Sequence, residues 1–481
     1  MGRIIAADRV TIPGPPQEVF EHLVSHGLPR WLIPPNGRLT AGTPVRIPLT
    51  LPVNLGGQTV EILGRVQGID PGRRIVVHHV LPWQGRIRVS VSSDRPGRST
   101  VSLAVELNDE VVQWAQERMA PVAQASTSTA WRIGLITSAS GSASVFSVSA
   151  RNIATMAVEE INADGGLAGR PLEILVGDDG THPGLGAAEL VRLAHSGCRV
   201  VVANVTSEVF AALRPVARRH GVLIIHTPLN EGGPVGSELI RFGERPTVQS
   251  AAVIPSLMRI TGSSRFFLAG NDYRWPRAAH KAVRREVERQ GGTVAAEAYS
   301  ELGTTDFHSV ISSIERSRAD LVISTFIGAD EVAFEQQMYQ AGMRDRVATW
   351  ALVLDESTHD YIGADASEGL WTAFSYFQGL DTAENQAFKA RYRARFGNSA
   401  PPVSSMTQCV YDALHLLARA TVRVGDWDPQ LIGEALRQGV EYLGPRGRIM
   451  SSWQGLQQPL YVAQSTKGTL SPVDRILPDS V

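Results

Sequence analysis

The chain has 481 residues, more than one hydrophobic core accommodates, so we expect at least two domains. Apolar residues make up 43% and charged residues 19%, as in ordinary globular proteins. The net charge of −1 creates no overall field toward nucleic acid or an anionic membrane, so no direct nucleic-acid partner is expected. The two cysteines, Cys198 and Cys409, form no zinc-binding pattern and no disulfide framework, although one bridge between them is conceivable. We expect two buried thiols, and neither a metal nor another cofactor.

The N-terminal residues bear on the cellular compartment. The first apolar run, Ile4 to Ala7, is interrupted by Asp8 and Arg9, whereas a secretory leader needs roughly 7–15 apolar residues before its cleavage site. No run in the chain approaches the roughly 18–20 apolar residues of a membrane span. We therefore expect a cytoplasmic protein with no membrane span, unless the native start differs.

Residues 1–120 have the pattern of a strand-rich domain. An alternating run at Asp8–Pro13 precedes a short amphipathic helix with the sequence PPQEVFEHLVS, and a second short helix is expected at Val111–Met119. Between the two helices, runs rich in β-branched residues predict an antiparallel meander with strands at Val45–Leu49, Thr59–Ile69, Arg74–Leu81, Arg86–Ser92 and Thr100–Glu106.

Three motifs in this segment resemble the START-like superfamily of polyketide cyclases and lipid-transfer proteins. They are VTIPGPPQEVFEHL near the start, Pro29-Arg30-Trp31-Leu32, and VQGIDPGRRI at Val66–Ile75. The resemblance implies an α+β helix-grip fold around an apolar cavity, although the helix that roofs such a cavity is cut to about nine residues here. His78 and His79 are interpreted as one exposed and one packed imidazole rather than a catalytic pair.

Residues 121–130, PVAQASTSTA, are small, polar and aperiodic, which is typical of a linker. From Trp131 strands and helices alternate, and two such α/β halves predict a two-lobed domain at 131–472. The first lobe is expected at about 131–250 together with part of the C-terminal region, and the second at about 262–400.

The candidate binding loops are those after Ile136, Asn204, His226, Ala269 and Thr325, because ligands bind beyond the carboxyl ends of parallel strands. The expected strands are Arg132–Ile136, Leu172–Val176, Arg199–Asn204, Val222–His226, Arg265–Ala269, Thr293–Tyr299 and Leu321–Thr325. The expected helices are Ser147–Asn162, His182–His195, Ser207–His220, Arg277–Gln290, Asp306–Ser317 and Glu331–Ala341.

Long stretches of the second domain resemble type I periplasmic binding proteins of the branched-chain amino acid branch, beginning with AVEEINADGGLAGRPLEILVGDDGTHPGLGAAELVRL. GNDYRWPR at Gly270–Arg277 and ADLVISTFIG look like the urea- and short-chain-amide-binding subgroup, which includes a cytoplasmic amide sensor. GPRGRI at Gly444–Ile449 is similar to its C-terminal module. The resemblance implies a venus-flytrap fold that closes on a small polar solute and catalyses nothing.

The resemblance also implies ligand-binding residues. Ser207 is expected to cap its helix and to offer a hydroxyl to a carbonyl or carboxylate oxygen. Tyr273 and Trp275 are expected to close over the ligand, unless they are core aromatics. Asp330 and Asp355 could receive an ammonium group or could be helix-start acids favoured by the dipole. The remaining candidates follow strands or replace subgroup residues: His226, Thr227, Asn230 and Ala329.

Departures from the subgroup predict the character of the pocket. Val205 and Asn230 stand in place of aromatic residues, and Ala329-Asp330-Glu331 replaces a turn rich in Gly and Thr. We expect a pocket larger and more polar than one for acetamide.

The sequence therefore favours solute binding by hinge closure in a cytoplasmic sensor. The closed form would be recognised by a regulator protein or by the fused first domain, and a homodimer is left open. The first alternative is the substrate-binding component of an ABC-type amide, urea or branched-chain amino acid transporter. The second is an enzyme or lipid binder that acts through the N-terminal cavity.

Overall fold

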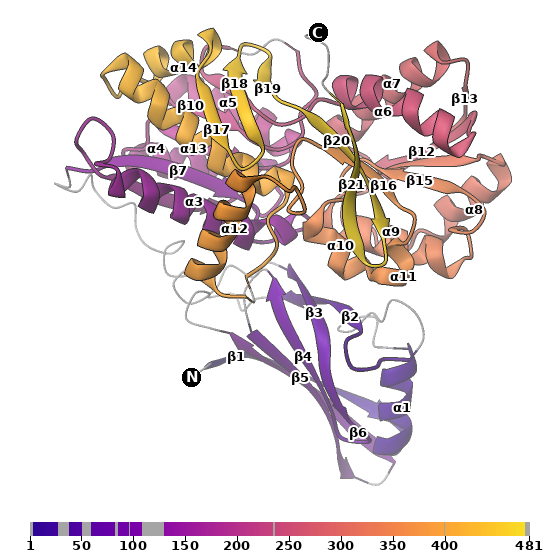
Figure 1. The fold of residues 1–481 in the computed structure, drawn as a ribbon. Coiled ribbons are helices and arrows are strands. Elements are labelled where there is room, and N and C mark those ends of the chain that lie inside the picture. Colours follow the sequence, from indigo (N-terminus) through magenta and orange to yellow (C-terminus); the bar gives the residue numbers. More distant parts are fainter. Residues whose placement is uncertain are drawn as a thin grey trace. The chain divides into compact units, whose positions relative to one another are not determined.

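The computed structural model of this chain describes residues 3–26, 38–50, 59–81, 85–95, 97–107, 129–233, 236–398 and 400–476. The chain divides after Pro121 into a first compact unit and a second that contains nearly all the remaining residues. Figure 1 shows the helices and strands of both units.

The described part of the first unit is a six-stranded antiparallel sheet and one helix, α1 (Pro16–His26), which packs against β5 and β6. The sheet order is β1-β6-β5-β4-β3-β2. Its strands are β1 (Arg3–Pro13), β2 (Pro44–Thr50), β3 (Thr59–Asp70), β4 (Arg74–Leu81), β5 (Gly85–Arg95) and β6 (Arg98–Leu107). Alternate residues of the strands are buried, as in Ile87, Val89 and Val91 of β5, because one face of the sheet meets the helix.

The structure confirms the expected strands and the first helix of this unit. It also confirms the interpretation of the histidine pair, since His78 is exposed and His79 is buried. The helix expected at Val111–Met119, the motif Pro29-Arg30-Trp31-Leu32 and most of the 121–130 linker lie outside the described residues.

The second unit begins with a lobe built on a parallel five-stranded sheet, in the order β11-β10-β9-β7-β8. Its strands are β7 (Trp131–Thr137), β8 (Leu172–Asp178), β9 (Val200–Asn204), β10 (Leu223–His226) and β11 (Leu239–Arg241). The early helices of this lobe are the short 3-10 helix η2 (Ser144–Phe146), α3 (Ser147–Ala163), α4 (Pro183–His195) and α5 (Ser207–His220).

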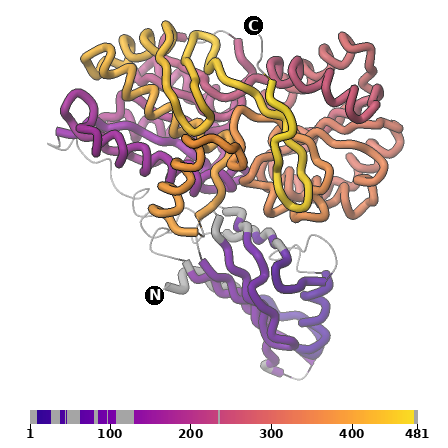
Figure 2. The backbone as a smooth tube through the Cα atoms, in the orientation of Figure 1, coloured from indigo at the N-terminus to yellow at the C-terminus, as the bar shows by residue number. Residues whose placement is uncertain are grey.

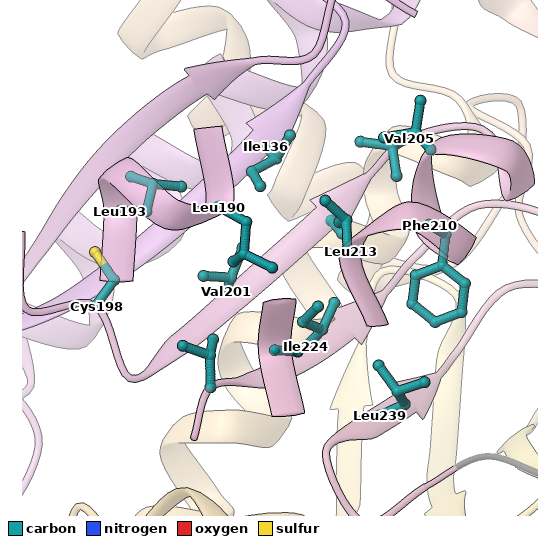
Figure 3. Close-up of a cluster of buried hydrophobic side chains, with 14 residues drawn as sticks. Ile136, Leu190, Leu193, Cys198, Val201, Val205, Phe210, Leu213, Ile224 and Leu239 are labelled. Atoms are coloured by element: carbon teal, nitrogen blue, oxygen red, sulfur yellow. The ribbon is translucent and has the colours of Figure 1, made fainter. Parts of the chain in front are cut away.

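Right-handed crossovers place α3 and α4 on opposite faces of this sheet, because the chain moves outward from β7 to β8 and then back past β7 to β9. Figure 3 shows the core between the sheet and helices α4 and α5, which includes Leu190, Val201, Phe210 and Leu213. Cys198 lies in this cluster, and both cysteines are buried and free, as expected.

The second lobe has a seven-stranded sheet in the order β13-β12-β14-β15-β16-β20-β21, in which only β20 and β21 run antiparallel to their neighbours. Its strands are β12 (Arg265–Asn271), β13 (Thr293–Ser300), β14 (Leu321–Thr325), β15 (Ala348–Ala351), β16 (Trp371–Phe374), β20 (Leu460–Thr466) and β21 (Thr469–Ile476). Its helices are α6 (Pro246–Thr261), α7 (Arg274–Arg289), α8 (His308–Ser317), α9 (Gly328–Gln340), α10 (Glu356–Ile362) and α11 (Ala364–Ser367).

The chain crosses between the lobes three times: between β11 and α6, between β16 and α12, and between β19 and β20 (Figure 2). The elements between the last two crossings complete the first lobe. They are α12 (Ala383–Phe396), α13 (Ser405–Val424), α14 (Pro429–Gln438), β17 (Glu441–Gly444), β18 (Gly447–Ser452) and β19 (Gly455–Gln457).

Helix α12 shows how the lobes divide the chain. The second lobe was expected to continue to about residue 400, yet α12 packs against α3 of the first lobe. Arg391 pairs with Glu160 at 2.8 Å and Arg395 with Glu159 at 2.8 Å, so ion pairs as well as packing hold α12 there. None of the helices in the described ranges combines the length and apolar composition needed to cross a bilayer.

Candidate functional site

A cavity of about 50 Å³ lies between the two lobes, at the carboxyl ends of their parallel strands, and we name it the cleft cavity. The loops that follow β9, β10, β12 and β14 all contribute to it, as the strand-end argument predicts. The first lobe contributes Ala143, Phe146, Asn204, Val205, Thr206, Ser207, Pro228, Leu229 and Met406. The second lobe contributes Tyr273, Trp275, Ile327 and Val353.

Ser207 lies in the cleft cavity at the start of α5, but it does not cap the helix as expected. The N-cap is Thr206, whose side-chain oxygen accepts a hydrogen bond from the backbone N–H of Val209 at 3.5 Å. Because Thr206 takes the capping role, the buried Ser207 hydroxyl forms no hydrogen bond with the described residues. A free hydroxyl at the positive end of a 14-residue helix is suited to a carboxylate or carbonyl oxygen.

Tyr273 and Trp275 face Ser207 from the second lobe. Helix α7 begins at Arg274, three residues earlier than expected, and Pro276 is accommodated in its first turn. Trp275 is only 2% exposed, and its indole N–H has no acceptor among the described residues. Burial, helped by nearby Glu231, raises the pKa of Tyr273, so its phenol stays neutral. The two aromatics thus present large apolar surfaces and one free donor to the cavity.

Contacts across the mouth of the cleft show that the lobes are closed on each other. The backbone N–H of Arg274 donates to Glu208 Oε1 at 3.0 Å, and its guanidinium lies 3.8 Å from Glu208 and 3.7 Å from Glu231. The backbone N–H of Ala329 donates to the carbonyl of Ser142 at 3.4 Å. Ala329, a predicted site residue, therefore joins the lobes beside the cavity.

The predicted residues His226 and Thr227, at the end of β10 and directly after it, lie around the cavity lining and are not part of it. The Thr227 hydroxyl accepts a hydrogen bond from the amide of Asn204 at 3.0 Å and so orients a lining residue. His226 Nε2 lies 2.9 Å from the carbonyl oxygen of Val205, and its ring stacks on Phe210. Burial lowers the pKa of His226 to about 3, so the ring is neutral and donates from Nε2.

Asn230 stabilises the segment of chain that precedes the first crossing to the second lobe. Its amide nitrogen donates to the Gly243 carbonyl at 2.8 Å, and its amide oxygen accepts from the Gly232 N–H at 3.0 Å. Asn230 thereby fixes the chain just before the first crossing to the second lobe.

The two acidic candidates have different surroundings. Asp330 Oδ2 accepts hydrogen bonds from the Asn271 amide and the Gly303 N–H, both at 2.8 Å, and so connects α9 to the end of β12 and to the loop after β13. Asp355 is fully buried two residues after the lining residue Val353. Burial raises the pKa of Asp355 to about 7, against the opposing effect of the Ser404 hydroxyl.

Most of the residues that line the cleft cavity are apolar. None of the described side chains that line it is charged. Asn230 and Asp330, both predicted site residues, lie outside the lining and form hydrogen bonds with Gly243 and Asn271. Several lining residues were not predicted from the sequence. Asn204, Thr206, Pro228 and Leu229 lie in strand-end loops and could have been found by position alone, whereas Phe146 and Met406 carried no such signal.

Residues 130–469 match the model of the family described as periplasmic binding protein. The chain belongs to this family. The leucine-, isoleucine-, valine-, threonine- and alanine-binding protein of Pseudomonas aeruginosa is 24% identical over 288 residues, which cover 59% of this chain and 76% of that protein. The Leu/Ile/Val-binding protein homolog 3 of Brucella melitensis is 22% identical over 315 residues, or 64% of this chain and 83% of that protein.

Solved structures of periplasmic binding proteins share the two-lobed fold. A leucine-binding protein from Thermotoga maritima superposes with a TM-score of 0.65 and 19% identity, over 73% of this chain and 100% of that chain. A solute-binding protein of an ABC transporter from R. palustris, in complex with benzoate, has a TM-score of 0.65 and 20% identity, over 73% and 97%. The predicted venus-flytrap fold is therefore confirmed.

Membership of the periplasmic binding protein family corrects the expected compartment. A cytoplasmic location, inferred from the N-terminal residues, is wrong, because proteins of this family act in the periplasm. The relatives are named as solute-binding proteins, in keeping with the expected non-catalytic role. The narrower resemblance to the urea and amide subgroup, and the START-like resemblance of the first unit, remain predictions.

Proposed function

We propose that this periplasmic binding protein is the substrate-binding component of an ABC-type transporter for small amino acids with apolar side chains. The observation that carries the proposal is the free, buried hydroxyl of Ser207 at the positive end of α5, within an otherwise largely apolar cavity. A ligand with a carboxylate at one end and an apolar body matches both features. The relatives named for leucine, isoleucine and valine support the same ligand class.

The apolar body of the ligand would contact side chains from both lobes. Phe146, Val205 and Leu229 come from the first lobe, and Ile327 and Val353 from the second. A ligand that touches both lobes stabilises their closed arrangement, since only the closed form makes both sets of contacts. This closure is what a transporter would recognise.

The ammonium group of an amino acid would be received by Asp355, which does not line the cleft cavity but lies two residues beyond Val353. One of its buried carboxylate oxygens, Oδ2, has no hydrogen-bond partner among the described residues. Because burial raises the pKa of this carboxyl to about 7, it is partly protonated near neutrality without a ligand. A nearby ammonium favours the ionised carboxylate, so binding of an amino acid would release a proton. Leucine affinity is therefore expected to rise between about pH 6 and about pH 8.

Isothermal titration of the full chain with leucine, isoleucine and valine tests the proposal, with benzoate, acetamide and urea as contrasting ligands. We expect the aliphatic amino acids to bind, and Asp355→Asn to weaken leucine at least tenfold while leaving any benzoate binding unchanged. Binding of acetamide or urea with no binding of the amino acids would overturn the proposal in favour of the amide subgroup. Binding of benzoate alone would overturn it in favour of an aromatic carboxylate transporter.

A further inference from the structure

A second cavity, of about 150 Å³, lies where the chain crosses between the lobes, and we name it the hinge cavity. All three crossings contribute to its lining: Glu244 and Arg245 from the first, Ser375 from the second and Gln458 from the third. The hinge cavity shares no lining residue with the cleft cavity. A molecule bound here would touch every segment that must bend when the lobes open.

Arg245 is the first feature of the hinge cavity that indicates a ligand. Its side chain is half-buried, and across the described ranges its guanidinium makes neither an ion pair nor a hydrogen bond. Burial lowers the pKa of Arg245, and no carboxylate offsets this effect. An arginine remains charged in proteins, so a partly desolvated guanidinium attracts an anion, for which its planar donors are well suited.

Gln249 is the second, independent feature. It is fully buried in the first turns of α6 and lines the same cavity. Its amide nitrogen donates to the Ala373 carbonyl at 2.9 Å, which fixes the orientation of the amide. The Gln249 Oε1 atom is left without a hydrogen-bond partner in the part of the chain that the structure describes. A buried acceptor in this state is stabilised when a bound molecule supplies a donor.

The negative charge of Glu244 does not exclude an anion, because its carboxylate already accepts hydrogen bonds from Ser375 and Ser405. Glu244 Oε1 accepts hydrogen bonds from the Ser375 N–H at 2.9 Å, from the Ser375 hydroxyl, and from the Ser405 hydroxyl at 2.8 Å. Arg446 donates to the Ser375 hydroxyl oxygen and, at 2.8 Å, to Gln458 Oε1. The same bonds connect the three crossings, so the cavity wall is part of the hinge.

We propose that the hinge cavity is a second ligand site, for a small carboxylate that also carries an O–H or N–H donor, and that its occupancy changes the affinity of the cleft cavity. The carboxylate pairs with Arg245, and the donor binds Gln249 Oε1. Binding at the two cavities is coupled because the hinge segments adopt different positions in the open and closed forms, and such coupling is reciprocal.

Lactate and malate are suitable probes because each carries a carboxylate and a hydroxyl, and acetate, which lacks the donor, is the contrast. Thermal shift and calorimetry of the full chain are expected to show binding of lactate or malate but much weaker binding of acetate. Arg245→Gln should reduce this affinity at least tenfold, and Gln249→Leu should abolish the preference over acetate. Arg245→Lys, which keeps the charge, should retain part of the affinity and so controls for folding.

A cleft variant separates the two sites. Ser207→Ala should leave lactate binding unchanged, whereas Arg245→Gln should leave leucine binding unchanged when no lactate is present. No binding of either hydroxy acid up to about 10 mM, well above the range of specific small-ligand recognition, would overturn the site. Equal binding by wild type and Arg245→Gln would overturn it as well.

The coupling is measured as the change in leucine affinity when the hinge probe is added. At least a twofold change is expected, and no change would overturn the coupling while leaving the site itself intact. This arm rests on the proposed function, since it uses leucine in the cleft. The lactate and malate titrations do not, so failure of the hinge site and failure of the transport proposal are distinguishable.

Discussion

At the scale of single residues, the candidate site depends on groups that the protein itself does not satisfy. Ser207 and Trp275 each bring a buried donor that makes no hydrogen bond with the described residues, and both face the cleft cavity. A buried polar group without a partner lowers stability, so such groups persist where a ligand completes them. Both residues line the cavity between the two lobes, where a small solute would bind.

Ser207→Ala should weaken leucine binding by about 1–3 kcal/mol, because the variant removes a hydrogen bond to the charged carboxylate. Apo stability should change little, since the hydroxyl has no partner within the described chain. Ser149→Ala is the matched control: Ser149 is equally buried, but its hydroxyl donates to the Pro402 carbonyl at 2.9 Å, outside the cavity. The control should lower stability without changing affinity per folded molecule, as measured by calorimetry and urea unfolding.

Trp275→Ala should weaken leucine binding by roughly 2–4 kcal/mol, the range of a buried interface aromatic. Trp275→Phe keeps most of the ring surface and removes the indole N–H, so it should cost about 0.5–1.5 kcal/mol of affinity. Titration calorimetry measures both effects, and denaturant unfolding measures apo stability. A large loss of apo stability with unchanged affinity would show instead that Trp275 is a core residue of the second lobe.

At the scale of elements, one buried arginine links the segments that join the lobes. Arg446, between β17 and β18, is 2% exposed and pairs with Asp412 of α13 at 2.8 Å. It also donates to Gln408 Oε1 at 2.6 Å and to the Ser405 carbonyl at 3.2 Å. Through Ser375 and Gln458 it reaches the second and third crossings, so the β17–β18 turn organises the hinge.

Arg446→Met should lower the free energy of unfolding by about 3–5 kcal/mol, because it leaves the buried Asp412 carboxylate without its counter-charge. The double variant Arg446→Met with Asp412→Leu should recover part of this loss, since no uncompensated charge remains. Urea unfolding of wild type, both single variants and the double variant gives the coupling energy. Strict additivity of the two substitutions would contradict the role assigned to the pair.

At the scale of the whole molecule, buried ionisable groups make stability depend on pH. Burial raises the pKa values of Asp179 and Asp355 to about 7 and that of Glu356 to about 8. Each of these carboxyls holds its proton more tightly in the folded state than in the unfolded state. Their stabilising contribution is present at low pH and is lost as the pH rises through the folded-state values. Burial lowers the pKa values of His226 and His280 to about 3 and about 4, which opposes this trend only below pH 6.5.

The melting temperature of the unliganded protein should therefore fall between about pH 6.5 and about pH 8.5, where the three carboxyls titrate and the two histidines do not. Asp179→Asn should make the decline shallower, because the neutral amide removes one titrating group. Asp306→Asn is the control: this exposed carboxyl has its pKa lowered by hydrogen bonds from His308 and stays ionised throughout the range. A stability that rises across this interval would contradict the prediction.

The sequence alone determined the alternation of strands and helices, because apolar periodicity and turn residues are local properties of the chain. It also located the loops that hold Ser207, Tyr273 and Trp275, since parallel strands bring their carboxyl ends to one edge. The family resemblance of residues 131–472 came from the same motifs. By contrast, the cytoplasmic location inferred from the first residues was wrong, because the chain belongs to the periplasmic binding protein family.

Only the tertiary structure decided which distant segments complete the site and the hinge. Met406 reaches the cleft cavity beside Asn204, whose amide donates to its carbonyl across 202 positions of sequence. Packing also decides that helix α12 joins the first lobe and that Arg446 meets the second and third crossings. The sequence pattern of a helix shows which of its faces is apolar, but not which distant element buries that face. The packing partner is determined by side-chain packing and by the pairing of buried charges.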